Sequence, residues 1–299
     1  MEGPIMKQKQ TIRSLNLKRL LFIAAVVLFL GLVIMPQHSM AQVACPGTST
    51  ADSDGDGFTD AQECAGITLS QGNLFGGATR VPTCTGGVAR DQCVDPNSKD
   101  AFVIVTRATP SLIPSDPFRY IAASTSSGGL GIAVHEITTT RTDRKITNQN
   151  ADGTIGGSLW PQLAARLRES LDISDVILGS ANQGIALDLA TVFTQRIVNF
   201  IVNSVCLANV ICVDSTAPTV NDRAAVIEKY IRHTIAHELG GHVLTLAPVY
   251  NSRYGGNHYQ SGTKVVMEQS VTYTSKSGKV TWYISTAYTD PDRAGIKLQ

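Results

Sequence analysis

Most of this sequence has no excess of basic charge. Five of the 25 Lys and Arg residues lie in residues 1–41, together with one of the 24 acidic residues, so residues 42–299 carry a net charge of −3. Proteins that bind nucleic acid normally show clustered positive charge. We therefore expect no nucleic-acid partner.

Long apolar runs are also scarce, and the clearest one stands near the start of the chain. Residues 20–35 form an apolar run that five basic residues precede and the small residues at 39–41 follow. This pattern is typical of a secretory signal peptide, here residues 1–41. The run is slightly short for a membrane-spanning helix, and an uncleaved anchor is the alternative. We expect a secreted, periplasmic or extracellular protein without membrane contact after cleavage.

The C-x-x-C spacing is absent, which argues against a zinc site built from thiolates. The six cysteines all lie after residue 41, and an even number in an exported chain predicts disulfides. Cys206 and Cys212 are close in sequence and are expected to pair. The other four pair among themselves in one of three ways: Cys45, Cys64, Cys84 and Cys93.

Residues 42–98 are poor in aromatic residues and rich in Gly, Asp, Cys and Thr, so they predict a small module that needs ions or disulfides for stability. Residues 99–299 have a different pattern, which predicts an α/β (α+β) domain with a mixed sheet. We expect strands at 101–105 and 129–140 and a hairpin at 270–286 around Gly278. We expect helices at 159–172, 186–205 and 222–246, the last one stopped by Pro248.

The stretch "DSDGDGFTDAQE" at 52–63 matches a calcium loop of the EF-hand type. Such a loop needs oxygen ligands at fixed positions and a glycine at position 6, which is Gly57 here. The predicted ligands are the carboxylates and one backbone carbonyl of Asp52, Asp54, Asp56, Phe58, Asp60 and Glu63. The alternative is an acidic, solvated turn.

No helical pattern precedes this loop, so the stretch resembles a thrombospondin type 3 repeat more than a full EF-hand. "CVDPNSKD" at 93–100 is similar to the continuation of those repeats. The resemblance implies a structural Ca²⁺ and makes Asp95 a further candidate ligand.

The stretch "HELGGH" at 237–242 carries one residue more than the H-E-x-x-H zinc motif. His237 and His242 would point about 140° apart on a regular helix and could not share an ion. A π-bulge can absorb one extra residue, and two adjacent glycines weaken a helix locally. Gly240 and Gly241 therefore predict a bulge that returns His242 to the side of His237. His135 stands alone and is interpreted as a structural histidine.

"HELGGH" is similar to the zinc motif of the dipeptidyl peptidase III family, but the E-E-x-x-x-D partner motif of that family is missing. "TIAHELGGHVLTL" at 234–246 resembles the zinc helix of metzincins with one glycine added. This resemblance implies a zincin-like fold with a long active-site helix, a third ligand and a methionine turn. Pro248 stands at the usual place of the third histidine. The candidates are therefore His258 as ligand, Glu268 as its alternative, and Met267 for the turn.

These motifs predict an exported zinc metallopeptidase that acts on proteins or peptides. Zn²⁺ would be held by His237, His242 and His258, and Glu238 would be the general base for a zinc-activated water. Pairing of His233 with His237, plain core packing of Met267, and a chance cluster of histidines remain alternatives. The alternative function is an inactive secreted calcium-binding adhesion or scaffolding protein with a degenerate zincin domain. A third alternative is a zinc hydrolase that acts on substrates other than peptides.

Overall fold

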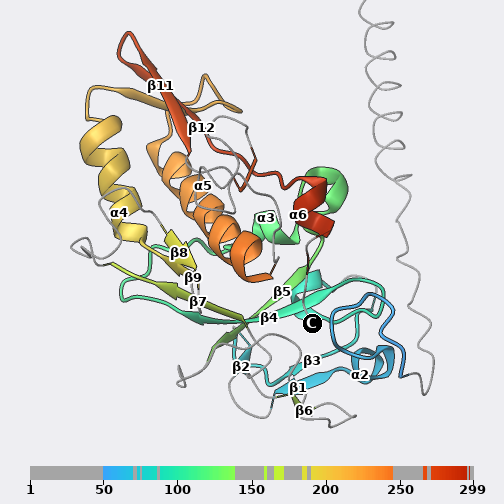
Figure 1. Cartoon of the computed structure of the whole chain (residues 1–299). Helices are drawn as coiled ribbons and strands as arrows, with labels where there is room; N and C mark the ends of the chain where they lie inside the picture. The colour runs from blue at the N-terminus through green and yellow to red at the C-terminus, as the bar shows by residue number, and fades with distance from the viewer. Residues whose placement is uncertain are drawn as a thin grey trace, which may run out of the picture. The chain divides into compact units, whose positions relative to one another are not determined.

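The computed structural model in Figure 1 describes residues 50–69, 73–74, 76–85, 88–138, 158–159, 165–171, 184–186, 190–244, 265–267, 271–294 and 296. They belong to one compact unit that begins at Gln42. The predicted signal peptide, Cys45, His258 and Glu268 lie outside the described residues. Among the described residues, no helix has the length and apolarity needed to cross a membrane. The proposed boundary between residues 98 and 99 stays a prediction.

A six-stranded mixed sheet forms the centre of this unit. Its four inner strands run parallel and each edge strand is antiparallel to its neighbour. The order is β2 (Asn73–Leu74), β5 (Ala133–Thr138), β4 (Asp100–Thr106), β7 (Ala165–Glu169), β9 (Ala190–Val192) and β8 (Gly184–Ala186). In β4 every residue except Thr106 is buried, as a continuous apolar run in an inner parallel strand predicts.

Two three-stranded sheets accompany the central one among the described residues. The first has the order β3 (Arg80–Val81), β1 (Ile67–Leu69) and β6 (Ser158–Leu159). The second has the order β10 (Ile211–Asp214), β12 (Lys279–Tyr283) and β11 (Thr272–Lys276). Ser277 and Gly278 connect β11 to β12 with φ of 50° and 74°. Two positive φ values favour a tight hairpin turn, and the predicted hairpin is confirmed.

Among the described residues, seven helical segments are short and two are longer. The short segments are α2 (Asp60–Ala65), η1 (Arg90–Gln92), α3 (Arg119–Ala122), η2 (Thr125–Ser127), α4 (Thr194–Asn199), the π-helix η5 (Phe200–Val205) and α6 (Asp290–Ala294). The longer ones are α5 (Arg223–Ile235) and the π-helix η6 (Ala236–Leu244), which follows it without a break. Asp222 caps α5 by accepting a hydrogen bond from the amide of Ala225 at 2.9 Å.

The predicted helix at 159–172 is wrong, because Ala165–Glu169 is the inner strand β7. It pairs in parallel with both β4 and β9, and within it Leu167 and Glu169 are buried whereas Arg168 is exposed. Short amphipathic stretches fit both periods, and here long-range pairing decides. The prediction for 186–205 is right only from Thr194, since Ala190–Val192 is a strand. The strand predicted at 101–105 is confirmed within β4, and the one predicted at 129–140 is confirmed only for Ala133–Thr138. The helix predicted from 222 is confirmed as α5 and η6 up to Leu244.

The main core lies between the central sheet and the α5–η6 helix, which contacts β7, β8 and β9 (Figure 1). Ile235 and Leu239 of the helix are fully buried there, as is Val192 of β9. A second cluster joins the N-terminal region to the sheet, because Phe58 packs edge to face against Phe102 of β4, with ring centroids 5.5 Å apart. The N-terminal region therefore shares a core with the sheet, which its sparse apolar content did not predict.

Two disulfides lie within the described residues. Cys206–Cys212 confirms the predicted pair, and Cys84–Cys93 selects among the pairings left open for the other four cysteines. Cys64 is also disulfide-bonded, to a partner outside the described residues. No cysteine among the described residues is free. Disulfides of this kind are compatible with an extracellular location.

Candidate metal centres

The helix that carries the "HELGGH" stretch changes from α to π hydrogen bonding at Ala236 and stays π-helical to Leu244. The π-helical turn that the two glycines predict is therefore present. A π-helix has more residues per turn than an α-helix, so a pair five residues apart comes to lie on one face. The extra residue in the motif is absorbed by the backbone.

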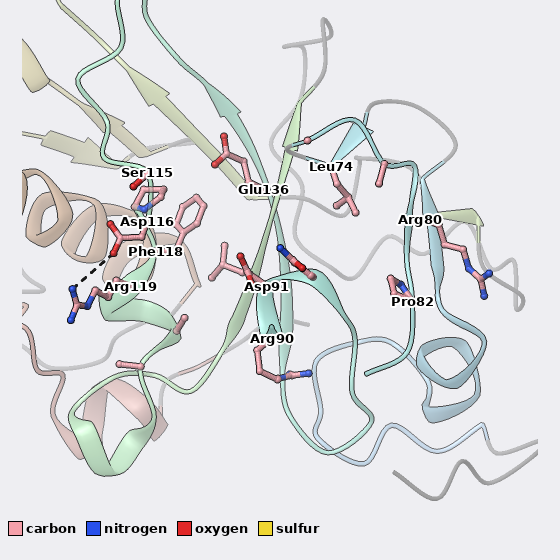
Figure 2. Close-up of a pocket in the computed structure, with 17 residues that line it drawn as sticks. Leu74, Arg80, Pro82, Arg90, Asp91, Ser115, Asp116, Phe118, Arg119 and Glu136 are labelled. Atoms are coloured by element: carbon pink, nitrogen blue, oxygen red, sulfur yellow. Dashed lines mark ion pairs between the residues drawn. The ribbon is translucent and has the colours of Figure 1, made fainter. Parts of the chain in front are cut away.

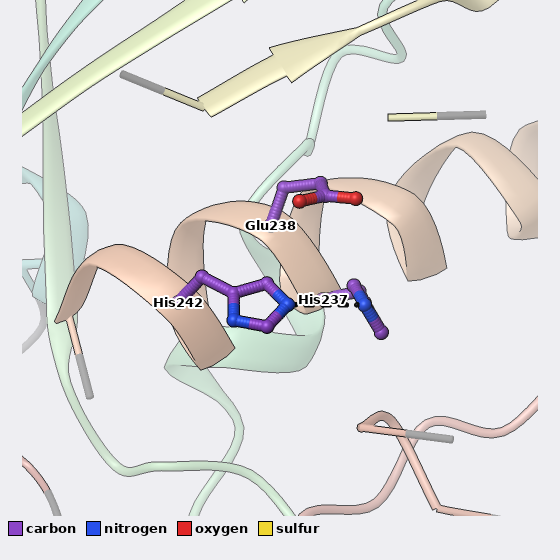
Figure 3. A group of neighbouring side chains, drawn as sticks. All are labelled: His237, Glu238 and His242. Carbon is purple, nitrogen blue, oxygen red and sulfur yellow. Dashed lines mark hydrogen bonds between the residues drawn. The ribbon is translucent and has the colours of Figure 1, made fainter. Parts of the chain in front are cut away.

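His237 and His242 face one another across this π-helical turn, as Figure 3 shows. Their Nε2 atoms are 3.3 Å apart, and the ring centroids are 5.0 Å apart. Two imidazole ligands of a tetrahedral zinc ion, each with a Zn–N distance of about 2.0–2.1 Å, would have nitrogens roughly 3.3 Å apart. The two rings thus already hold the spacing of a shared tetrahedral ion.

A hydrogen bond fixes the orientation of the His237 ring. Its Nδ1 lies 2.8 Å from the carbonyl oxygen of Val266. A carbonyl only accepts, so Nδ1 is the protonated nitrogen and Nε2 keeps its lone pair. Histidines that bind metals are commonly oriented by such a bond from the other ring nitrogen. Val266 and Met267 are both buried against the helix.

Gly240 and Gly241 have a second role besides loosening the helix. A β-carbon on Gly240 would overlap the hydroxyl of Tyr288, and one on Gly241 would overlap the sulfur of Met267. The hydroxyl of Tyr288 donates a hydrogen bond of 2.7 Å to the carbonyl of Ala236, the first residue of the π-helix. The missing side chains therefore admit two residues that pack against the bulge. The contact with Met267 fits the predicted place of a methionine under the metal helix, although packing alone identifies no family.

Glu238 completes a group of three side chains whose candidate ligand atoms all lie within 4.8 Å of one another, the others being His237 and His242. Its side chain is buried, and burial raises the pKa of Glu238 to about 8. Loss of water around the carboxylate disfavours its charge. A cation bound at the two histidines would oppose this effect and favour the carboxylate.

His233 lies apart from this group. Its Nδ1 donates a hydrogen bond of 2.9 Å to the carbonyl of Ser285, and its ring centroid is 6.2 Å from that of His237. Burial lowers the pKa of His233 to about 4. Among the described residues, the group of three candidate ligands contains His237 and His242 and does not contain His233. His258 and Glu268, the candidate third ligands, lie outside the described residues.

The acidic loop brings together most of the carboxylates that the motif predicts. One group of neighbouring carboxylates consists of Asp52, Asp54 and Asp56, and a second consists of Asp56, Glu63 and Asp100. Asp60 lies elsewhere, because its carboxylate accepts hydrogen bonds from the amide and hydroxyl of Ser53 at 2.8 and 2.7 Å. The ring of Phe58 enters the core, and its amide donates to Asp56 at 2.8 Å.

The carboxylates of this loop are buried to a degree that is costly for charged groups. Burial, reinforced by the charge of neighbouring carboxylates, raises the pKa of Asp54 to about 7, of Asp56 to about 8 and of Glu63 to about 10. Both carboxylate oxygens of Glu63 are buried without a hydrogen-bond partner among the described residues. Several hard oxygen donors in one loop are the ligand set that Ca²⁺ prefers.

Asp100 is the residue of this cluster that the sequence motif did not identify. It opens β4, 37 positions after Glu63, and it is fully buried. Asp95, the candidate suggested by the repeat resemblance, instead pairs with Arg90 at 3.8 Å and accepts a hydrogen bond from the amide of Asn97. The sequence signal that could have identified Asp100 is an aspartate directly before an apolar strand.

A separate cavity of about 820 Å³ lies between the segment at 115–123 and the loops around β3 and η1 (Figure 2). Its lining includes the ion pair between Asp116 and Arg119, whose charged atoms are 4.0 Å apart. None of His237, Glu238 and His242 lines it. We therefore assign this cavity no part in the chemistry of the histidine cluster.

Comparison of the chain with protein-family models, with curated proteins and with solved structures gives no match. The resemblances to metzincins and to thrombospondin type 3 repeats consequently remain predictions.

Proposed function

We propose that this protein is an exported zinc metallopeptidase. The observation that carries the proposal is the 3.3 Å separation of the Nε2 atoms of His237 and His242, which matches two ligands of one tetrahedral zinc ion. The hydrogen bond from His237 to the carbonyl of Val266 supports it, because it leaves the ligating nitrogen unprotonated. We further propose that the mixed sheet and the long α5–η6 helix form a zincin-like domain.

The side chains of this site divide the work between binding and proton transfer. His237 and His242 hold the ion, and His258 or Glu268 supplies the third ligand. When bound, zinc polarises a substrate carbonyl and makes water a better nucleophile at neutral pH. Glu238 takes the proton of the attacking water and passes it to the leaving amine. The substrate is a protein or peptide.

The alternative of an inactive adhesion or scaffolding module is less well supported. If the extra residue in the motif had destroyed the site, His237 and His242 would lie on different faces of the helix. Instead the π-helix brings them back together, and Glu238 lies with them in one group.

We also propose that the loop at 52–63 binds Ca²⁺ in a structural role. The unpartnered oxygens of Glu63 and the shared position of Asp56 in two carboxylate groups support this. The ion would neutralise carboxylates that burial otherwise disfavours as charged groups. The loop and its ion would then stabilise a region with little apolar core of its own.

The test compares Glu238→Gln with Glu228→Gln in the purified, zinc-loaded protein. Glu228 lies on α5 with a side chain 54% exposed, so its variant is a matched control that should behave as the wild type. Glu238→Gln should keep about one zinc per chain and lose casein hydrolysis by roughly 10²–10⁴-fold, because an amide cannot accept the proton. Metal content and casein digestion are the measurements. Absence of zinc from the wild type, or full activity of Glu238→Gln, would overturn the proposal.

A further inference from the structure

We infer that the cation of the acidic loop is also bound by the central sheet, with the carboxylate of Asp100 as the ligand. The site then consists of loop residues, chiefly Asp56 and Glu63, and the first residue of β4. The EF-hand pattern contains no such residue, because its ligands all come from one loop. This inference rests on the proposed binding of Ca²⁺ by the loop and is independent of peptidase activity.

The loop and the head of β4 are already in contact at this point. The amide of Asp100 donates a hydrogen bond of 2.7 Å to the carboxylate of Asp56. The ammonium group of Lys99 donates to the carbonyls of Asp54 and Gly55, the latter at 2.9 Å. Candidate ligand atoms of Asp56, Glu63 and Asp100 all lie within 4.8 Å of one another. The geometry therefore requires no movement of the loop to make Asp100 a ligand.

Glu63 provides the independent observation that points to a cation. It is fully buried, and neither carboxylate oxygen has a hydrogen-bond partner in the part of the chain that the structure describes. A buried carboxylate without partners is costly, and coordination of an ion is one of the few arrangements that offset the cost. Glu63 stands at the last position of the loop motif, where calcium loops place a bidentate ligand.

No basic group among the described residues pairs with Glu63. Lys99 donates to backbone carbonyls, and Arg90 approaches Asp100 at 3.5 Å. The Nε2 atom of His135 lies 2.7 Å from the same oxygen, Oδ1 of Asp100, and its Nδ1 lies 3.0 Å from the carbonyl of Asp91. His135 and Arg90 thus orient Asp100, as residues that contact a metal ligand commonly do.

The consequence is that Ca²⁺ fastens residues 52–63 to a strand of the central sheet. β4 pairs directly with β7, and β7 contacts the helix η6 that carries the histidine cluster. Removal of Ca²⁺ is therefore expected to loosen the head of β4 as well as the loop.

The test is calcium titration calorimetry of the full-length purified protein in zinc-containing buffer, with the variants Asp100→Asn and Asp95→Asn. Asp95→Asn is the matched control, since it makes the same change five residues earlier and also removes a partner of Arg90. Asp100→Asn should weaken Ca²⁺ binding at least about tenfold, whereas Asp95→Asn should bind as the wild type does. Equal affinity of Asp100→Asn and wild type would overturn the inference while leaving the loop site intact.

If Asp100→Asn does not fold, amide hydrogen exchange of the wild type with and without Ca²⁺ is the second test. Ca²⁺ should protect amides at the start of β4, including that of Asp100, together with those of residues 52–63. Protection confined to the loop would contradict the role of Asp100. A wild type that binds no Ca²⁺ at all would overturn both this inference and the calcium role of the loop, and would leave the zinc proposal untouched.

Discussion

The histidine cluster on η6 and the carboxylate cluster around residues 52–63 differ in how far apart their residues lie along the chain. His237, Glu238 and His242 come from one helix, and a change of helical type brings them together. Asp56 and Glu63 lie beside Asp100, which opens a strand 44 positions after Asp56. A site within one element can be inferred from spacing, whereas a site between elements depends on the fold. The contrast also predicts that the two sites can be disrupted separately.

Loss of one histidine should have the largest effect, because it should remove one metal and leave the other in place. His242→Ala is expected to abolish zinc binding, because one ligand of a three-residue set is gone, and to leave Ca²⁺ affinity unchanged. His233→Ala should keep zinc, since His233 bonds to Ser285 and lies outside the cluster. Metal analysis and calcium calorimetry on both variants are the measurements. Zinc retained in His242→Ala and lost in His233→Ala would show that the pair is His233 with His237.

Protonation of His233, on the helix, should make the free energy of unfolding depend on pH. Its pKa falls from an ordinary value of 6.5 to about 4 on folding, so the unfolded chain binds the proton more tightly. Stability is therefore full above pH 6.5 and is lost as the pH falls towards 4, by on the order of 3 kcal/mol. His233→Gln lacks this titration.

The measurement is chemical denaturation of wild type and His233→Gln between pH 7 and pH 4, with EDTA present throughout. The difference in free energy of unfolding between the two proteins should shift in favour of the variant as the pH falls. A difference that is constant with pH would show that His233 is not buried in its neutral form.

A methyl group at Gly241 should have the smallest effect of the three and should act through packing. Gly241→Ala would overlap the sulfur of Met267, and overpacking of this kind typically costs about 1–3 kcal/mol. Gly278→Ala would serve as a poor control because its φ is 74°, so Ala224→Gly on the exposed face of α5 is the better reference. Shortening Met267 to Ala in the Gly241→Ala background should recover part of the loss, as measured by thermal unfolding. Additive losses would contradict a direct contact between the two residues.

The sequence allowed prediction of features that depend on near neighbours. The π-helical turn followed from the five-residue spacing and two glycines, the hairpin from Gly278 between two strand patterns, and one disulfide from the proximity of Cys206 and Cys212. The general mixed α/β class followed from the order of the patterns. The turn, the hairpin and the disulfide are each decided within about ten residues, where propensity and spacing act directly.

Features that depend on distant segments were predicted wrongly or not at all. The stretch at 165–169 has helical spacing, but pairing with β4 and β9 makes it a strand. Asp100 joins the acidic loop only because β4 passes beside it. The bond from His237 to Val266 spans 29 residues. These arrangements depend on burial and long-range pairing, which local patterns do not determine.

The segment at 285–288 supports the histidine helix from several sides. The carbonyl of Ser285 receives the bond from His233, the carbonyl of Ala287 receives the amide of Val266 at 2.8 Å, and the hydroxyl of Tyr288 reaches Ala236. A ribosome makes these residues well after the helix itself, and a chain emerges from its N-terminal end first. The helix can therefore gain these contacts only after the segment near residue 288 has been synthesised, so a nascent chain that ends before this segment cannot hold the histidine cluster in its final surroundings.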